Sequence, residues 1–540
     1  MAKTATTNLR PVTDLSRPQV FIETYGCQMN VNDSEVVLSI LQDNGWALCD
    51  SISNADLILI NTCSIRDNAE KRVLGRLDVF RQEKKKRRVI VGVLGCMAER
   101  LKASLLENEA VDIVAGPDAY RDLPRLIAGI RDGEKQINTL LSHEETYADI
   151  TPVRTDPSGV SAFISIMRGC NNVCSYCIVP YVRGAERSRD PNSILREASQ
   201  LIKAGYREIT LLGQNVDSYL WAEASNPTRS VNFAQLLEQV ALLDPTVRIR
   251  FATSHPKDMG DDVLYVMAMY ENICKHIHLP VQSGSTPMLE KMNRKYTREQ
   301  YLARVDKIRE ILPDCVITTD VIAGFSGETD EDYRQTLSLM EAVRFDSAFM
   351  FQYSERPGTK ASRHYPDDVP PEVKTSRLNG IIALQNEISL ERNREWVGRV
   401  VEVLIDGPSK RCGDELAGRT DGNKTCVFPA EGHHAGECVT VHIDSCTSAT
   451  LLCHIVQETA PSMEDVIDSI RGSIPPIKPL KDIKPLKDLK EDLKDIKSRS
   501  PFKDIKPLKE LKEDLKEGFK DGFKGRRGRR PASGKKDDTE

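Results

Sequence analysis

Short apolar runs alternate with helix-like segments along the N-terminal part of the chain. A helix is predicted to begin at the cap Asn32-Asp33-Ser34 and to end at Asn44, before Gly45. Apolar runs of this length, each followed by a segment with helical spacing, indicate a parallel α/β sheet. The predicted strands are residues 20–23, 57–61, 89–94 and 111–115. The polar segment from Gly129 to Gly159 is expected to be a connector.

A cysteine follows three of these four strands. Cys27, Cys63 and Cys96 each come two to four residues after the last residue of a predicted strand. Ligands of parallel sheets bind outside the carboxyl ends of the strands, so the three thiols are expected to converge on one edge. We interpret them as ligands of a metal cluster rather than as three unrelated buried thiols. Cys49 does not share this position and is expected to be structural.

Strand and helix patterns continue to alternate from Ala162 to Tyr353. Six such units predict a parallel barrel, which is open if it has only six strands. The predicted strands are 161–167, 208–212, 248–252, 275–279, 315–321 and 347–353, with helices at 193–204, 233–243, 298–311 and 331–343. The catalytic face of such a barrel lies at the carboxyl ends of the strands.

Three cysteines lie on the loop after the first strand of this barrel. Cys170, Cys174 and Cys177 have C-x-x-x-C-x-x-C spacing. Thiolates are preferred ligands of iron–sulfur clusters, and three of them on a 4Fe-4S cluster leave one iron open to a substrate. A structural zinc loop would need a fourth Cys or His at short spacing, and none follows Cys177 within reach of a short loop. The loop therefore predicts an iron–sulfur cluster with a free coordination site.

Polar residues follow the other barrel strands at the same face. His255, His276 and His278 could bind a metal, but hydrogen bonding at the barrel rim is their expected role. The candidate cofactor-binding residues are Tyr176, Gln214, Asn215, Ser254 and Asp320.

The region from Trp396 to Val456 has a different pattern, with short β runs separated by Gly, Pro and Asn turns. It predicts a small β-barrel, a fold that often binds single-stranded or looped RNA, and the alternative is a barrel that serves only as a scaffold. The runs are residues 400–405, 424–428, 437–443 and 450–455. Four cationic residues in or near its loops suit an RNA backbone: Lys410, Arg411, Arg419 and Lys424. Its cysteines form no C-x-x-C pair and are expected to be core or surface thiols: Cys412, Cys426, Cys438, Cys446 and Cys453.

The composition fits a protein of several domains. The 540 residues are 40% hydrophobic, enough for large cores. The net charge of −5 does not itself indicate nucleic-acid binding, so any RNA contact must use local basic patches. No apolar run is long enough for a membrane, and Met1 to Pro18 lacks the apolar core of a signal peptide. The 14 sparse cysteines suit a reducing cytoplasm better than a secreted disulfide protein.

The last 82 residues, 459–540, are low in complexity. Residues 482–494 recur almost unchanged as 504–516, and Arg526-Arg-Gly-Arg-Arg530 forms a basic cluster suited to phosphate. Because nothing nearby offers a core, this tail is expected to be disordered or marginally helical.

Six motifs together give the chain a resemblance to the methylthiotransferases of the radical S-adenosylmethionine (SAM) superfamily. They are Tyr25-Gly-Cys-Gln-Met-Asn30, Asn61-Thr-Cys63, Gly95-Cys-Met-Ala98, the Cys170 loop with Tyr176, Leu212-Gly-Gln-Asn-Val-Asp-Ser-Tyr219 and His278-Leu-Pro-Val-Gln-Ser-Gly-Ser285. Within that family the chain most resembles the enzymes that act on isopentenylated adenosine in tRNA. The resemblance covers about residues 18 to 457 and stops before the tail.

The resemblance implies a fold with three domains and two clusters. An N-terminal methylthiotransferase domain would span 18–134, a radical SAM core with a partial (β/α)6 barrel 156–390, and a TRAM-like β-barrel 393–458. Cys27, Cys63 and Cys96 would hold an auxiliary 4Fe-4S cluster. The cysteines of the Cys170 loop would hold the 4Fe-4S cluster that cleaves SAM.

The resemblance also implies a reaction and partners. One SAM would supply a methyl group, and a second would yield the radical that removes hydrogen from carbon 2 of the dimethylallyl-adenosine beside the anticodon. Side-chain bases cannot remove that hydrogen, because the C–H bond is neither acidic nor polarised. The partners would be the anticodon stem-loop of tRNA and an electron donor such as flavodoxin or ferredoxin, with a monomeric enzyme. The alternatives are methylthiolation of threonylcarbamoyl-adenosine or of a ribosomal-protein aspartate, and a non-catalytic iron–sulfur protein that binds RNA.

Overall fold

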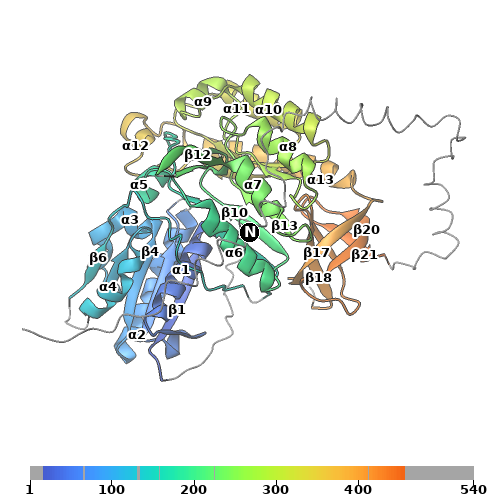
Figure 1. Ribbon diagram of the computed structural model, residues 1–540. Helices are drawn as coiled ribbons and strands as arrows, with labels where there is room; N and C mark the ends of the chain where they lie inside the picture. The colour runs from blue at the N-terminus through green and yellow to red at the C-terminus, as the bar shows by residue number, and fades with distance from the viewer. Residues whose placement is uncertain are drawn as a thin grey trace, which may run out of the picture. The chain divides into compact units, whose positions relative to one another are not determined.

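The N-terminal domain is built on a six-stranded parallel sheet (Figure 1). The computed structural model describes residues 16–64, 67–130, 134–156, 158–223, 225–410 and 413–456. The sheet has the order β2-β1-β3-β4-β5-β6, so β1, β3 and β4 are direct neighbours. The strands are β1 (Gln19–Tyr25), β2 (Ala47–Leu48), β3 (Leu57–Thr62), β4 (Ile90–Gly95), β5 (Ile113–Ala115) and β6 (Gln136–Asn138). The predicted parallel sheet is confirmed.

Helices cover both faces of this sheet. Leu57 and Leu59 of β3 pack in one apolar cluster with helix α1, whereas Ile58 and Ile60 pack in a second cluster with α2 and α3. Burial on both faces explains why the strands are continuous apolar runs in the sequence. The helices are α1 (Gln28–Asp43), α2 (Asp67–Lys86), α3 (Cys96–Leu101) and α4 (Leu123–Ile130).

Two predictions for this domain were wrong. Helix α1 begins at Gln28 with Cys27 as its N-cap, and Asn32, Asp33 and Ser34 are buried inside it. These polar residues have partners deeper in the protein and are not needed at the helix end. The segment from Gly129 to Gly159, predicted to be a connector, contains strand β6, which pairs in parallel with β5. Its side chains are mostly polar, so the sequence gives no strand pattern there.

The central domain is a partial barrel of six parallel strands. Two three-stranded sheets, β7-β10-β13 and β14-β15-β16, are joined by a single bridge between Ile249 and Ile273. All six predicted strands are confirmed: β7 (Ser161–Ser165), β10 (Glu208–Leu212), β13 (Arg248–Ala252), β14 (His276–His278), β15 (Val316–Ala323) and β16 (Ser347–Gln352). The surrounding helices include α6 (Pro191–Lys203), α7 (Phe233–Ala241), α8 (Asp261–Met269), α10 (Arg298–Ile311), α11 (Asp330–Val343) and α13 (Pro371–Arg394).

The C-terminal domain is a closed barrel of five strands (Figure 1). They are β17 (Val400–Pro408), β18 (Glu415–Thr420), β19 (Thr425–Pro429), β20 (Cys438–Cys446) and β21 (Leu451–Ile455). The sequence missed β18, whose inward positions include Gly418 and Thr420 rather than large apolar residues. A Cβ on Gly418 would lie 2.4 Å from the carbonyl oxygen of Leu404, so close strand approach requires glycine there.

Among the cysteines of this barrel, Cys426 and Cys453 are buried in its core, Cys438 is exposed and Cys446 is half-buried. This agrees with the predicted core and surface thiols, and Cys412 lies outside the described residues.

The barrel is fastened to the amino-terminal ends of the central strands. Arg419 pairs with Glu208 at 2.8 Å, and Arg250 donates to the carbonyl of Thr420 at 2.8 Å. Lys424 pairs with Asp346 at 2.8 Å and is itself buried. The prediction that Arg419 and Lys424 face RNA was therefore wrong, because both are occupied by carboxylates of the central domain.

Lys410 is exposed and stays a candidate for RNA contact, whereas Arg411 lies outside the described residues. The predictions for the tail after residue 458 also lie outside them. None of the described helices has both the length and the apolar composition needed to cross a membrane.

Two candidate cysteine sites

The first site lies at the carboxyl ends of three neighbouring strands. Cys27 caps α1 after β1, Cys63 directly follows β3, and Cys96 directly follows β4. The thiols of Cys27 and Cys63 share a hydrogen bond. Cys96 is close enough to Cys27 for the charge of that thiol to raise the pKa of Cys96. The structure thus brings together three cysteines far apart in sequence, as the strand-end argument predicted.

Two glycines let the backbone approach these thiols closely. A Cβ on Gly26 would lie 2.6 Å from the Cβ of Cys63. Gly95 has a φ of +86°, and a Cβ there would lie 2.3 Å from Oδ1 of Asn61. Side chains at these positions would push the strand ends apart. Gly26 and Gly95 therefore allow the thiols of Cys27, Cys63 and Cys96 to lie close together.

A buried charge network connects this site to the central domain. Asp33 accepts hydrogen bonds from Nη1 of Arg168 and from Nη2 of Arg183, both at 2.8 Å. Nε of Arg183 also donates to the sulfur of Cys96 at 3.2 Å. Arg168 belongs to β8 (Met167–Arg168) and Arg183 ends α5 (Val179–Arg183). These arginines therefore join the two domains and place positive charge beside the thiols.

The electrostatics of the site favour the thiolate of Cys27. The hydrogen bond with Cys63 lowers the pKa of the Cys27 thiol to about 6, and the charge of Arg183 acts in the same direction. Burial raises the pKa of Cys96, although Arg183 opposes this. Nη1 of Arg183 is buried and has no hydrogen-bond partner among the described atoms. Three thiols beside an unused guanidinium donor fit an anionic, sulfur-rich metal cluster.

The second site is the loop between β8 and α5. Cys170, Cys174 and Cys177 lie on it, and the backbone N–H of Cys177 donates to the carbonyl of Cys174 at 3.1 Å. The loop is set by Gly169, which has a φ of +73° and whose Cβ would lie only 2.0 Å from the carbonyl oxygen of Ala185.

The thiols of this loop need a cation to ionise together. Burial raises the pKa of the Cys170 thiol to about 11, and burial together with the charge of Cys174 raises the pKa of Cys177. Nη1 of the buried Arg294 donates to the sulfur of Cys174 at 3.3 Å. One guanidinium balances at most one thiolate, so a metal cluster would supply the remaining positive charge.

Among the predicted cofactor residues, Asn215 is tied to the cysteine loop. Its Nδ2 donates to Oδ2 of Asp258 at 2.7 Å, and Nδ2 of Asn172 in the loop donates to the same oxygen at 3.2 Å. Oδ1 of Asn215 is buried and has no partner among the described atoms, so it can accept from a bound ligand. Gln214 beside it is half-buried. The ring of Tyr176 packs edge-on against Phe325 with centroids 6.3 Å apart.

The other predicted cofactor residues are Ser254, two residues after β13, and Asp320, inside β15. The hydroxyl of Ser254 donates to Asp217 at 3.4 Å, and burial raises the pKa of that carboxyl to about 7. Asp320 lies 3.4 Å from Nε2 of His278, whose Nδ1 bonds the hydroxyl of Thr318 at 3.0 Å. His276 bonds the same hydroxyl at 3.1 Å, so these histidines form rim hydrogen bonds as predicted.

Sequence reasoning missed the charged residues that serve the thiols. Arg168 and Arg183 flank the cysteine loop, two residues before Cys170 and six after Cys177, and this proximity was an available signal. Arg294 is 120 residues from Cys174 and Asp33 is 135 residues from Arg168, so no local pattern could have found either pair.

Three family models match the chain in succession. They are described as "Uncharacterized protein family UPF0004" over residues 19–116, "Radical SAM superfamily" over 164–340 and "TRAM domain" over 394–456.

Solved structures of radical SAM enzymes are only remotely similar to this chain. The TsrM methyltransferase of Kitasatospora setae matches with a TM-score of 0.47 and 14% identity, over 62% of this chain and 72% of that chain. OxsB, a cobalamin-dependent radical enzyme, matches with a TM-score of 0.44 and 15% identity, over 69% of this chain and 56% of that one. These similarities are too distant to add to the assignment.

Curated relatives are much more similar. A tRNA-2-methylthio-N6-dimethylallyladenosine synthase of Bacteroides fragilis is 56% identical over 434 residues, which is 80% of this chain and 94% of the relative. Those of Phocaeicola vulgatus and Amoebophilus asiaticus are 54% and 55% identical and cover 84% and 82% of this chain, and 99% and 94% of their own lengths. With two cysteine sites and this identity over nearly the whole length of its relatives, the chain belongs to the family of tRNA-2-methylthio-N6-dimethylallyladenosine synthases.

Proposed function

We propose that this protein converts N6-(dimethylallyl)adenosine beside the anticodon of tRNA to its 2-methylthio form. It would use SAM and two 4Fe-4S clusters, an auxiliary one on Cys27, Cys63 and Cys96, and a SAM-binding one on Cys170, Cys174 and Cys177. The observation that carries the proposal is the pair of separate thiol groups, each with its own buried arginine donor at 3.2–3.3 Å from a sulfur. A structural cluster would normally have every iron ligated by protein, whereas each group offers only three thiols.

The protein's own residues supply charge, position and exclusion of water. When bound and reduced, the SAM-binding cluster would supply the electron that cleaves SAM to methionine and a radical able to remove hydrogen from an unactivated C–H bond. Arg294 would position Cys174 through its hydrogen bond to the sulfur, and Asn215 with Asp258 would order the loop against bound SAM. Arg183 would give a cationic contact to the auxiliary group at Cys96.

The inner face of the partial barrel offers an apolar contact for the dimethylallyl group. Phe349 pairs with Asp320 and Phe351 pairs with Ile322, so these side chains lie on one face of the sheet. The ring of His278 meets Phe349 edge-on at 5.9 Å, which places that face inside the barrel. Phe349 and Phe351 remain 55% and 39% exposed, so they can still bury apolar surface against a ligand.

The same face argues against the alternative substrates. A threonylcarbamoyl group or an aspartate carries a carboxylate that needs a dedicated cation once it is buried. Asp320 on this face would repel such a carboxylate, whereas an uncharged dimethylallyl chain meets no penalty.

Replacing Phe349 with Ser should reduce the preference for isopentenylated over unmodified tRNA by about tenfold. The change removes a large apolar contact worth about 1.5 kcal/mol or more, and 1.4 kcal/mol corresponds to about tenfold. The measurement is the ratio of kcat/KM for the two RNAs. Leu242→Ser is the control, since Leu242 is 63% exposed at the end of α7 on the outside of the domain. An unchanged ratio in the Phe349 variant would remove this residue from the substrate contact.

Further parts of the proposal concern organisation and partners. We propose three domains near residues 18–134, 156–390 and 393–458, with the first extended to include β6. The anticodon stem-loop would be the RNA partner, and a flavodoxin or ferredoxin in the cytoplasm would supply electrons to a monomeric enzyme. Lys410 is an exposed cation on the C-terminal barrel and supports RNA contact.

The auxiliary group can be tested separately from SAM cleavage. The triple variant of Cys27, Cys63 and Cys96 to Ala should still cleave SAM reductively but should transfer no methylthio group. The expectation follows from the separate positions of the two thiol groups, one on the N-terminal sheet and one on the loop before α5. Mass spectrometry of the tRNA and chromatography of deoxyadenosine measure the two activities.

Cys438→Ala is the matched control, because this thiol is exposed on the C-terminal barrel. Formation of 2-methylthio product by the triple variant would refute the auxiliary assignment. Loss of SAM cleavage together with transfer would show instead that the two groups do not act independently.

A further inference from the structure

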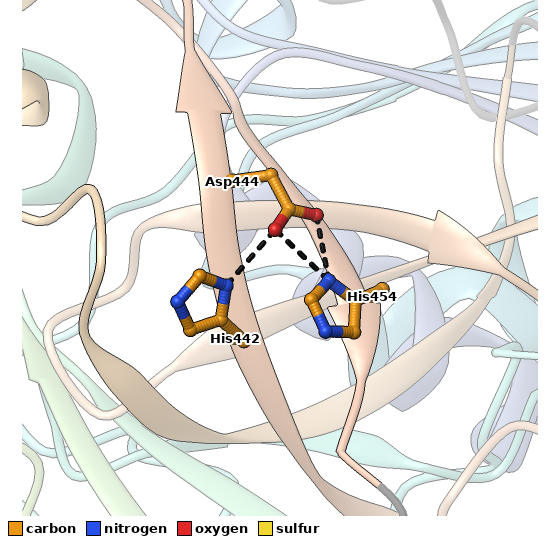
Figure 2. A group of neighbouring side chains, drawn as sticks. All are labelled: His442, Asp444 and His454. Atoms are coloured by element: carbon orange, nitrogen blue, oxygen red, sulfur yellow. Dashed lines mark hydrogen bonds and ion pairs between the residues drawn. The ribbon is translucent and has the colours of Figure 1, made fainter.

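The outer face of the C-terminal barrel carries a cluster of two histidines and a carboxylate. Figure 2 shows His442 and Asp444 of β20 beside His454 of β21, with ring nitrogens of both histidines directed at the carboxylate. His442 and His454 are direct partners in the antiparallel pairing of these strands. Asp444 lies two residues beyond His442, at an irregularity of the strand pairing between Ile443 and Ser445, and its carboxylate lies beside both rings. The direct pairing of His442 with His454, together with this irregularity, brings the three side chains together.

The distances within this His–Asp–His cluster are short. Nδ1 of His442 lies 2.9 Å from Oδ1 of Asp444, and Nδ1 of His454 lies 2.8 Å from Oδ2. One nitrogen or oxygen from each residue lies within 4.8 Å of the other two. The side chains are 36%, 45% and 54% exposed in chain order, so an ion can reach them from solvent.

We propose that this cluster is a binding site for a borderline divalent transition-metal ion, with Zn²⁺ as the representative ion. Two imidazole nitrogens and one carboxylate oxygen are a ligand set suited to zinc, and water would complete a tetrahedron. Bonds of about 2.0–2.1 Å place tetrahedral ligand atoms roughly 3.3 Å apart, so the present contacts need to open by only about 0.4 Å. Each histidine would carry its proton on Nε2 and coordinate through Nδ1.

A second group of histidines and a carboxylate on the same barrel provides a comparison for the His–Asp–His cluster. His433 bonds Glu437 at 2.7 Å, and His434 lies 3.8 Å from the same carboxylate. This group also has two histidines and an acid. Within the described part of the chain, however, only the His–Asp–His cluster brings three such ligand atoms within 4.8 Å of one another. Zinc should therefore distinguish the two groups, whereas simple histidine–carboxylate pairing would not.

The test is zinc binding by the full chain with both iron–sulfur clusters reconstituted. After anaerobic equilibrium dialysis against Zn²⁺, the protein should hold one zinc per chain at this site, with the iron content unchanged. Asp444→Asn and His454→Ala should each weaken zinc binding by at least about tenfold, since even partners outside the ligand shell contribute about 10–100-fold. His433→Ala should bind zinc as the parent does. Zinc X-ray absorption should show nitrogen and oxygen neighbours.

Three results would overturn the proposal. Zinc content equal in the parent and in the double variant His442→Ala/His454→Ala would place the ion elsewhere or nowhere. An equal loss in His433→Ala would mean unspecific binding by surface histidines. Sulfur neighbours in the absorption spectrum would show that zinc had entered a cysteine site. None of these outcomes depends on methylthio transfer, so they are independent of the proposed function.

Discussion

Cys174→Ala is expected to abolish reductive cleavage of SAM and to remove about half of the iron of the reconstituted protein. Cys174 is buried and is the thiol that accepts the hydrogen bond of Arg294, so its loss removes both a ligand and the cation's partner. Two remaining thiols cannot hold a cluster with one open iron in a fixed position. Deoxyadenosine formation and iron per chain are the measurements.

The control for this variant is Cys446→Ala, which removes a half-buried thiol from the C-terminal barrel. It should retain the parent's iron and cleavage rate. Arg294→Lys adds a finer comparison, because lysine keeps the charge but loses the planar donor. Undiminished deoxyadenosine formation by Cys174→Ala would show that the loop does not carry the SAM-cleaving cluster.

Asp33→Ala is expected to destabilise the protein by about 3–5 kcal/mol, the usual cost of removing one partner from a buried ion pair. Asp33 is fully buried and pairs with Arg168 and Arg183, which are 2% and 3% exposed. Its loss leaves two guanidinium groups without their shared carboxylate at the junction of two domains. The denaturant midpoint measured by circular dichroism should fall accordingly.

The pH dependence of stability has a definite sign at this residue. Burial opposes ionisation, but Arg168 and Arg183 outweigh it and lower the pKa of Asp33. A carboxyl whose pKa is lower in the folded state contributes stability above its unfolded pKa of about 3.9 and loses it as the pH falls further. Asp33→Ala should therefore flatten the acid limb of the stability curve.

Asp78→Ala is the matched control for the change at Asp33. Asp78 pairs with Arg81 on the surface, where the two side chains are 66% and 42% exposed, and such pairs contribute about 0–1 kcal/mol. Equal effects of the two substitutions would mean that Asp33 does not hold the domains together.

The sequence predicts structure best where burial imposes a simple pattern. Strands β3 and β10 are buried along their whole length, and their predicted ends lie within a residue of the observed ones. Strands with small or polar inward residues give no such pattern, as in β6 and in β18 around Gly418. The rule that ligands gather at the carboxyl ends of parallel strands is enough to group Cys27, Cys63 and Cys96 at one site.

Partners that lie far apart in sequence set the limit of that reasoning. The sequence around a lysine near a turn does not show whether the lysine contacts RNA or a buried carboxylate. Lys424 is an example, because it pairs with Asp346 of the central domain. Arg183 lies near the cysteine loop in sequence, whereas Arg294 comes from a loop 120 residues from Cys174 and contacts it only in the tertiary fold. No local motif marks Arg294 as a partner of the thiols.

The ion pairs of Arg419 and Lys424 hold the C-terminal barrel against the central domain. The barrel contacts the amino-terminal ends of β10 and β13. The loop that carries Cys170, Cys174 and Cys177 lies beyond the carboxyl ends of the same sheet. The distance between the barrel and this loop is therefore set by the length of the two five-residue strands, which is roughly 15 Å at about 3.3 Å per residue. We expect an RNA bound by the barrel to bring to this loop only a nucleotide that lies at the matching distance along its backbone.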